Sequence, residues 1–364
     1  MFSPKLLGRC SIEQAAVCLF GALLPLVALP APSYQVFVTN ERSGDVTVIT
    51  GADFSVVETI SVGTRPRGIH VSPDGKTVYV AVSGTPIGKV PQIDARGNPI
   101  IKKSKSDDAV GGPEADKAAD GIVMLDVASK KLIGKIFAGS DPEEFDLSHD
   151  GSQIYVSNED TKSASVLNIA KETVEHVIPV GQEPEGVTTT PDGKYFYVTC
   201  EAGGDILAID TSSYVATSHF KVEGRPRSVA FLADGKIGFI PSESTGQLNV
   251  IDTSIPAVLK TITLPPGSRP MRVRVAPDGS KFYLSNGRAG TISVMDARTY
   301  ALLDTIKVGP RPWGIGISPD GKYLFAANGP SNDVSVVDLS TDKEIAKVKA
   351  GSSPWGVAIV SSAN

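Results

Sequence analysis

The chain has few of the residues that form disulfides and metal sites. Its 364 residues include three cysteines and four histidines, and Cys10 and Cys18 both lie within the first 31 residues. If those residues are removed as a leader, Cys200 remains alone and no internal disulfide can form. The sequence has no HxxxH or CxxC metal-ligand pair, no CxxCH haem attachment and no GxSxG nucleophile elbow. We therefore expect no cofactor, no metal site and no catalytic residues of these common kinds.

The sequence also lacks excess positive charge, a secure membrane span and helical periodicity. The formal net charge is -5, which makes nucleic acid a poor partner. An apolar run, 15–31, follows Lys5 and Arg9 and is too short and too proline-broken for a membrane span. It predicts a secretory signal peptide at 1–31, with an uncleaved anchor as the alternative, and a periplasmic or secreted protein that does not span the membrane.

What the chain has in abundance is a repeat. A GxxP tetrapeptide followed by a short apolar run occurs six times in full and once shortened, at intervals of 76, 42, 42, 44, 42 and 42 residues. The prolines are Pro66, Pro142, Pro184, Pro226, Pro270, Pro312 and Pro354. A fixed period of about 40 residues is typical of a propeller or a solenoid, and the absence of a 3.6-residue apolar pattern disfavours helical solenoids.

Each unit contains four short β-rich runs separated by turn residues. The first follows GxxP, the second is a YVxN-type run such as the one ending at Asn158, the third ends at Asp338 in its last copy, and the fourth is a run such as the one ending at Gly309. A turn of the type Ser72–Lys76 (SPDGK) separates the first two and suits a type I turn. Four antiparallel strands in each of seven units predict an all-β, seven-bladed β-propeller.

The two ends of the chain predict how the ring closes. The first recognisable strand, 34–40, is a second strand of a blade, and the last, 355–360, is a first strand. The ends therefore complete one blade, which removes unpaired edges. We expect one propeller domain, 32–364, which we take to be a monomer.

The first interval is 34 residues longer than the usual 42, and the excess falls at about 83–119. Because the first strand leaves the GxxP loop and the second returns to it, this insertion is expected on the GxxP face. It is compatible with a lid, a docking arm or a tolerated loop, since lengthening a loop costs little closure entropy.

The residues that flank each proline are expected to surround the mouth of the channel on the GxxP face. Candidate binding residues there are Arg65, Arg67, Glu143, Glu185, Arg227, Arg311, Trp313 and Trp355. Acids come from blades two and three and arginines from blades one and four to six. The two tryptophans are expected next to each other, in a patch with Arg67 and Arg311. Aromatic and guanidinium groups are enriched at binding hot spots, although the charges could also form solvated pairs.

Deeper in the channel, the second and fourth residues after proline are mostly small. The exceptions are His70 in blade one, Glu144 and Asp146 in blade two, and Arg272 and Arg274 in blade five. Blades two and five are three apart in a ring of seven, so these acids and arginines are expected to face each other. They predict either structural ion pairs or a site in which arginines hold an anion.

Several runs resemble the YVTN family of β-propellers. They include YQVFVTNERSGDVTVI, RPRGIHVSPDGKTVYVAVSG and RPWGIGISPDGKYLFAANGPSNDVSVVDL. More narrowly, they are similar to exported propellers associated with pyrroloquinoline quinone-dependent alcohol catabolism in Gram-negative bacteria. That resemblance implies a periplasmic accessory and supplies no catalytic residues. Quinoprotein dehydrogenases typically have eight tryptophan-docked blades, whereas seven are expected here.

The sequence therefore predicts a non-enzymatic binding or scaffolding propeller. Its expected partner is a periplasmic protein, such as a quinoprotein dehydrogenase or a transporter component, or a small anionic ligand. The alternative is a metal-assisted lactonase or related hydrolase, for which Glu144, Asp146 and His70 could supply the groups at the channel mouth.

Overall fold

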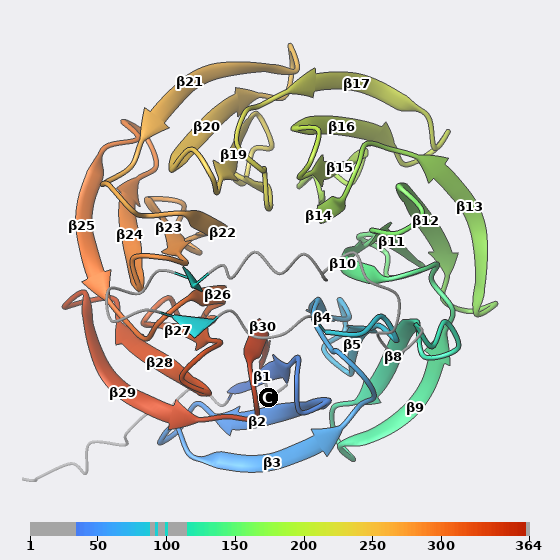
Figure 1. Ribbon diagram of the computed structural model, residues 1–364, viewed down its shortest axis with the longest axis horizontal. Helices are drawn as coiled ribbons and strands as arrows, with labels where there is room; N and C mark the ends of the chain where they lie inside the picture. Colours follow the sequence, from blue (N-terminus) through green and yellow to red (C-terminus); the bar gives the residue numbers. More distant parts are fainter. Residues whose placement is uncertain (1–33, 88–91, 94–98, 101–114, 362–364) are drawn as a thin grey trace, which may run out of the picture. The chain divides into compact units, whose positions relative to one another are not determined.

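Seven four-stranded antiparallel sheets are arranged around a central axis as the blades of a propeller (Figure 1). The computed structural model describes residues 34–87, 92–93, 99–100 and 115–361. Within these ranges the regular elements are all strands. The seven-bladed β-propeller predicted from the repeat is confirmed.

We number the blades by their prolines, so that blade one follows Pro66 and blade seven follows Pro354. The first strand of each blade lies nearest the axis and the fourth lies at the rim (Figure 1). Blade one comprises β4 (Ile69–Val71), β5 (Thr77–Val82), β8 (Gly121–Asp126) and β9 (Lys131–Ile136), and blade two comprises β10 (Pro142–Leu147), β11 (Gln153–Asn158), β12 (Ser163–Asn168) and β13 (Thr173–Pro179). Blade three comprises β14 (Pro184–Thr189), β15 (Tyr195–Cys200), β16 (Asp205–Asp210) and β17 (Ala216–Lys221), and blade four comprises β18 (Ala230–Phe231), β19 (Ile237–Ser242), β20 (Gln247–Asp252) and β21 (Ala257–Thr263). Blade five comprises β22 (Pro270–Val275), β23 (Lys281–Asn286), β24 (Thr291–Asp296) and β25 (Leu302–Lys307), and blade six comprises β26 (Pro312–Ile317), β27 (Tyr323–Asn328), β28 (Asp333–Asp338) and β29 (Lys343–Lys349). Blade seven comprises β30 (Pro354–Ser361), β1 (Tyr34–Asn40), β2 (Asp45–Thr50) and β3 (Val56–Ser61).

Blade seven joins the two ends of the described chain. Its strand order is β3-β2-β1-β30, and β1 pairs with β30 so that Phe37 lies opposite Ala358. The closure predicted from the sequence is therefore confirmed. Without this pairing, the inner edge of β1 would be available to pair with another chain.

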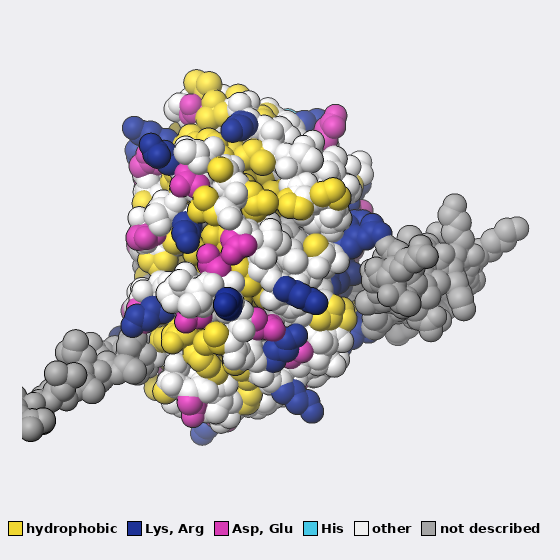
Figure 2. Space-filling model, turned by 90° about the vertical axis from the view of Figure 1, so that its left-hand side faces the viewer, with side chains coloured by type: hydrophobic (Ala, Val, Ile, Leu, Met, Phe, Trp, Pro, Cys, Tyr) yellow, Lys and Arg dark blue, Asp and Glu magenta, His cyan; other side chains and the backbone are white. Residues whose placement is uncertain are grey.

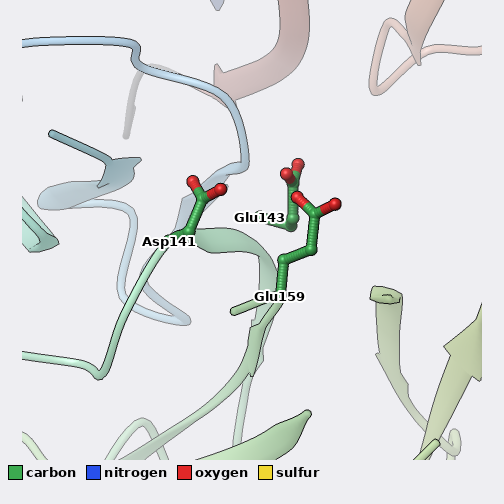
Figure 3. A group of neighbouring side chains, drawn as sticks. All are labelled: Asp141, Glu143 and Glu159. Atoms are coloured by element: carbon green, nitrogen blue, oxygen red, sulfur yellow. The ribbon is translucent and has the colours of Figure 1, made fainter. Parts of the chain in front are cut away.

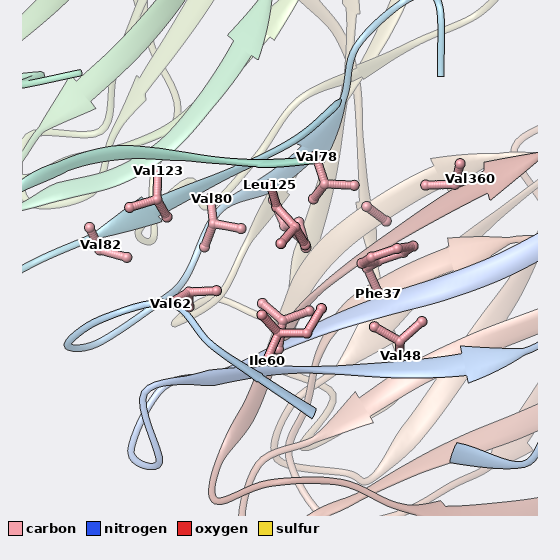
Figure 4. Close-up of a cluster of buried hydrophobic side chains, with 13 residues drawn as sticks. Phe37, Val48, Ile60, Val62, Val78, Val80, Val82, Val123, Leu125 and Val360 are labelled. Carbon is pink, nitrogen blue, oxygen red and sulfur yellow. The ribbon is translucent and has the colours of Figure 1, made fainter. Parts of the chain in front are cut away.

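The core lies between neighbouring blades. Second and third strands are buried on both faces because each blade is covered by two others, which explains their continuous apolar runs. Between blades seven and one, for example, Phe37 and Ile60 pack with Val80 and Leu125 (Figure 4). Seven such clusters distribute the hydrophobic stabilisation around the ring.

The turn between the first and second strands has the geometry that its residues predict. In blade one the Gly75 N–H donates to the Ser72 carbonyl (2.9 Å), and Gly75 has a positive φ of 71°. The Asp74 carboxylate accepts the Ser72 hydroxyl (2.6 Å) and the Lys76 N–H (3.1 Å). These turns form the face of the propeller opposite to the GxxP loops, which we call the PDG face.

Fourth strands form the rim, where hydrophobic and charged side chains are interspersed (Figure 2). Leu302 and Leu303 of β25 are both exposed. This strand ends at Lys307, two residues before the run predicted to end at Gly309. Beyond it, the Val308 N–H bonds to the Gly290 carbonyl of the preceding loop (3.0 Å) instead of extending the ladder.

The ends of the predicted insertion meet beside the GxxP loop of blade one. The Gly84 N–H donates to the Asp120 carboxylate (2.8 Å), the Asp116 N–H donates to the Gly84 carbonyl (3.0 Å), and Ser83–Ile87 line a surface groove with Thr64 and Arg65. Between these ends the structure describes only β6 (Gln92–Ile93) and β7 (Pro99–Ile100), which pair with each other. The rest of the insertion, and the predicted signal peptide at 1–31, lie outside the described residues. No helix among the described residues has the length and apolar character needed to cross a membrane.

Candidate binding site in the propeller channel

The residue before each GxxP proline has an unusual backbone conformation that the sequence did not predict. All seven are left-handed and none is glycine, with φ between 48° and 61°. They are Arg65, Asp141, Glu183, Arg225, Arg269, Arg311 and Ser353. Such a conformation is unfavourable for residues with a Cβ, so neighbouring contacts must hold it.

Three arginines of this set bond to glutamates of the preceding blade. Arg65 lies 3.2 Å from Glu41, and Arg269 lies 2.9 Å from Glu243. Arg225 similarly donates to Glu201 (2.6 Å). These glutamates directly follow second strands. The signal was present in the sequence, because Glu41, Glu159, Glu201 and Glu243 occupy this position in four of the seven units, but the alignment by prolines did not reveal it.

The residue after each proline is held at the GxxP end of the channel by hydrogen bonds between blades. Hydroxyl groups on second strands donate to its backbone carbonyl in the next blade: Thr39 to Arg67 (2.7 Å), Ser157 to Glu185 (2.8 Å) and Ser285 to Trp313 (2.7 Å). This position therefore has a fixed backbone, and its side chains form the mouth ring, which we define as Arg67, Glu143, Glu185, Arg227, Met271, Trp313 and Trp355.

Arg67 is the central cation of a buried acidic cluster. Its guanidinium lies 2.7 Å from Asp141 and is also bonded to Glu143, while Asp141 accepts the Ser83 hydroxyl (2.6 Å) and an N–H of Arg65 (3.1 Å). Burial alone raises the pKa of Asp141, but Arg67 and Arg65 outweigh it and the net shift is downward. Burial raises the pKa of Glu143 well above its usual range, against the influence of Arg67, and Glu185 adds to the rise.

Asp141, Glu143 and Glu159 are the only three acids or histidines among the described residues whose possible ligand atoms all lie within 4.8 Å of one another (Figure 3). A cation would have to compete there with Arg67, which already bonds to two of the three. The cluster therefore does not fit a resident metal ion. The alternative metal ligands His70, Glu144 and Asp146 do not converge in this way.

The two tryptophans are adjacent and Arg311 lies beside them, as predicted, but the Arg67 guanidinium does not. Trp313 and Trp355 stack at 5.7 Å between ring centroids. Arg311 and Arg227 lie 4.9 and 5.2 Å from the Trp313 centroid. The predicted neighbour Arg67 turns towards blade two instead, because Asp141 and Glu143 lie there.

Arg227 connects the acidic and aromatic halves of the mouth ring. It lies 3.3 Å from Glu185 and 2.5 Å from Glu243, and it also bonds to Glu201. The sequence predicted acids and arginines on different sides of the mouth. Ion pairs between neighbouring blades neutralise most of these charges. These pairs are mostly buried rather than solvated.

Inside the channel, the predicted contact between blades two and five is present. Arg272 forms an ion pair with Glu144 across the channel and lies 5.6 Å from the Trp355 ring. His70 Nε2 lies 3.1 Å from Glu144 Oε1, and His70 Nδ1 lies 3.6 Å from Asp146 Oδ1. The structure thus brings His70, Glu144, Asp146 and Arg272 together.

Arg274 differs from the other channel residues. Among the described residues, no hydrogen bond or ion pair joins its guanidinium to another side chain. Burial lowers the pKa of Arg274, and Asp146 only partly offsets the effect. Burial and the neighbouring Arg274 also lower the pKa of Arg272. The influence of Arg274 on Arg272 is repulsion between two like charges, which an added anion would offset.

His70 should make stability depend on pH. Burial lowers its pKa to about 4 from 6.5, with Arg274 and Arg272 acting in the same direction and Asp146 against them. Between these two values the unfolded chain binds more protons than the native chain, so stability should fall as the pH is lowered through this window. We expect His70→Gln to flatten the dependence of the melting temperature on pH there. An unchanged slope would contradict the assignment.

These strands and this channel define a seven-bladed β-propeller with a charged axis. Two family models match it, each over less than half of the chain: "YNCE-like beta-propeller" over residues 192–364 and "Lactonase, 7-bladed beta-propeller" over residues 32–176. The chain is thus similar to both kinds of propeller. Its association with quinone-dependent alcohol oxidation stays a prediction.

Individual relatives agree with this at the level of the fold. YncE of Salmonella typhi is 34% identical over 70 residues, which are 17% of this chain, and the chain spans only 20% of that protein's length. The periplasmic gluconolactonase PpgL of Pseudomonas aeruginosa has a TM-score of 0.70 at 20% identity, over 90% of this chain and 99% of that one. Hydrazine synthase of Kuenenia stuttgartiensis has a TM-score of 0.64 at 20% identity, over 80% and 89%.

Proposed function

We propose that this protein is an exported, non-enzymatic binding propeller that holds a small anionic ligand in its channel. The observation that carries the proposal is Arg274, a channel cation with no bonded partner among the described residues, beside a second arginine that is paired only with Glu144. The resemblance to exported propellers supports a periplasmic accessory of quinone-dependent alcohol oxidation, with a dehydrogenase or a transporter component as its protein partner.

Native purification from the periplasm tests this proposal. We expect mass spectrometry to find a stoichiometric anionic molecule on the wild-type protein and at least a roughly tenfold lower occupancy on Arg274→Gln, because the charge that attracts the anion is gone. The melting temperature should be nearly unchanged, since Arg274 has no ion pair with any described residue to lose. Equal occupancy in both proteins would refute the proposal, and co-purifying proteins would identify the partner.

A second candidate function is lactone hydrolysis. Its support is the match of residues 32–176 to a lactonase propeller model, together with His70, whose low pKa leaves it neutral and able to act as a base beside Glu144. We expect gluconolactone turnover, if present, to be lost in His70→Gln. Absence of turnover by the wild-type protein would remove this candidate and leave the binding proposal intact.

A further inference from the structure

We propose that the channel is a well that is closed at the GxxP end and open at the PDG face, so that the ligand enters from the PDG face. This inference rests on the proposed anion-binding function for the identity of the ligand, but the direction of entry stands on the packing of the channel alone. The sequence predicted the binding residues on the GxxP face. This inference places the entrance on the opposite face.

The mouth ring closes the GxxP end. Every one of its seven side chains is large, and they meet across the axis: Glu185 of blade three and Trp355 of blade seven line the same small cavity. Arg227 bonds to Glu185 and lies over Trp313, so it spans from blade three to blade six. A ligand cannot pass this level unless several buried ion pairs and the tryptophan stack separate.

The next level is also occupied. One residue deeper, Glu144 and Arg272 pair directly across the channel. Most other blades have glycine here because the neighbouring first strand is too close for a side chain. A Cβ on Gly356 would lie 2.5 Å from the Arg67 carbonyl oxygen, and one on Gly314 would lie 2.4 Å from that of Trp355. The pair of Glu144 and Arg272 therefore forms the floor of the well.

Two residues further along the first strands, roughly 7 Å nearer the PDG face, lies what we call the wide level. Its large side chains are His70, Asp146 and Arg274; the other four blades have the small residues Thr188, Ala230, Gly316 and Ala358 there, of which Ala230 and Ala358 pack into the cores between blades. The exposed fraction of the side chains rises in the same direction, from 3% for Glu144 and 11% for Arg272 to 21% for His70 and 22% for Asp146. Solvent therefore reaches these groups from the PDG side.

The polar groups in the well indicate the chemistry of the ligand. Because ionised Glu144 can only accept, the neutral His70 donates its Nε2–H to it and leaves the Nδ1 lone pair facing Asp146. Asp146 is held by the N–H groups of Leu147 (2.8 Å) and Thr189 (2.7 Å) and is also an acceptor. A hydroxyl group that lies beside both acceptors would satisfy them. We infer a small carboxylate or phosphate that also carries hydroxyl groups, with its anionic end on Arg274.

Cysteine accessibility tests the direction of entry without knowledge of the natural ligand. Thr188 lies at the wide level and Ser228 at the narrow one, and both donate a hydroxyl to a carbonyl of the next blade, at Val229 (2.9 Å) and Met271 (3.1 Å). Thr188→Cys and Ser228→Cys are therefore matched variants. The probes are methyl methanethiosulfonate, which is neutral, and its 2-sulfonatoethyl analogue, which is anionic. Labelling is measured on the peptide that contains the new cysteine, so native cysteines do not interfere.

We expect both probes to label Thr188→Cys at least about ten times faster than Ser228→Cys, because a thiol must reach solvent to react. Adding Trp355→Ala should leave the rate at position 188 within about twofold, whereas a tenfold rise would show entry through the mouth ring and overturn the inference. Equal rates at the two positions would overturn it as well. His70→Cys, at the wide level on blade one where the native side chain is 21% exposed, replaces Thr188→Cys if that variant does not fold.

Charge separates this inference from the proposed function. Adding Arg274→Gln to Thr188→Cys should slow the anionic probe about tenfold and leave the neutral probe unchanged. If both probes still label quickly and neither responds to Arg274→Gln, entry from the PDG face stands and anion binding fails. If the anionic probe responds to Arg274→Gln but reacts faster after Trp355→Ala, anion binding stands and the direction of entry is wrong.

Discussion

Replacement of Arg67 by methionine is expected to lower the free energy of unfolding by about 3–5 kcal/mol, the typical cost of removing one partner from a buried ion pair. Arg67 is bonded to both Asp141 and Glu143, and its side chain is almost fully buried. Methionine keeps much of the apolar stem, so the loss comes mainly from the carboxylates left without their cation. Urea unfolding at neutral pH measures the effect.

Arg311→Met is the control for Arg67→Met. Arg311 is exposed and lies on the face of Trp313, so its loss should cost less than about 1 kcal/mol.

The effect of Arg67→Met should also shrink in acid. Arg67 helps to hold the pKa of Asp141 below its usual range, and this contribution is lost as the pH falls through that pKa. A loss below about 1 kcal/mol at neutral pH would contradict the role of Arg67.

The fold could be predicted from the sequence because the repeat carries its own register. Each proline marks the start of a first strand, and each PDG turn marks the end of one. The run 34–40 could be recognised as a second strand only by comparison with the other copies, and that comparison predicted its pairing with β30. Local turn chemistry and a period of about 40 residues were sufficient for this step.

The site could be predicted only in part. Alignment by proline placed Glu144 and Arg272 in facing blades, and they form an ion pair. It could not show that the left-handed residue before proline bonds to the glutamate after the second strand of the preceding blade, as Arg65 does with Glu41. That contact joins two positions that lie far apart within the repeat. Only the packing of adjacent blades reveals which of them meet.

The position after the second strand also explains where Met271 and Trp313 of the mouth ring occur. Blades five and six have Gly287 and Gly329 there instead of a glutamate. A Cβ on Gly287 would lie 3.1 Å from the Met271 side chain, and one on Gly329 would lie 3.6 Å from the Trp313 side chain. Large apolar residues of the mouth ring therefore occupy space that a glutamate side chain fills elsewhere. The aromatic half of the mouth ring is thus a packing feature first, and this supports the assignment of the mouth ring as the closed end.

Arg272→Gln is expected to have a very different effect from Arg274→Gln, although both arginines were predicted as equivalent channel residues. Arg272 is the ion-pair partner of Glu144, whose side chain is only 3% exposed. Its loss should destabilise the propeller by about 3–5 kcal/mol, because an uncompensated carboxylate remains in the channel. Arg274→Gln should be within about 1 kcal/mol of the wild-type protein, because Arg274 has no such pair in the part of the chain that the structure describes. Thermal and urea unfolding of the two variants, in parallel, measure the difference.

The double variant Glu144→Gln/Arg272→Gln separates the ion pair from the packing of its side chains. We expect it to recover more than half of the stability lost in Arg272→Gln, because two neutral amides can bond to each other and leave no buried charge. If the double variant is no more stable than Arg272→Gln, the stem of Arg272 against Trp355, rather than its charge, supports the floor of the well.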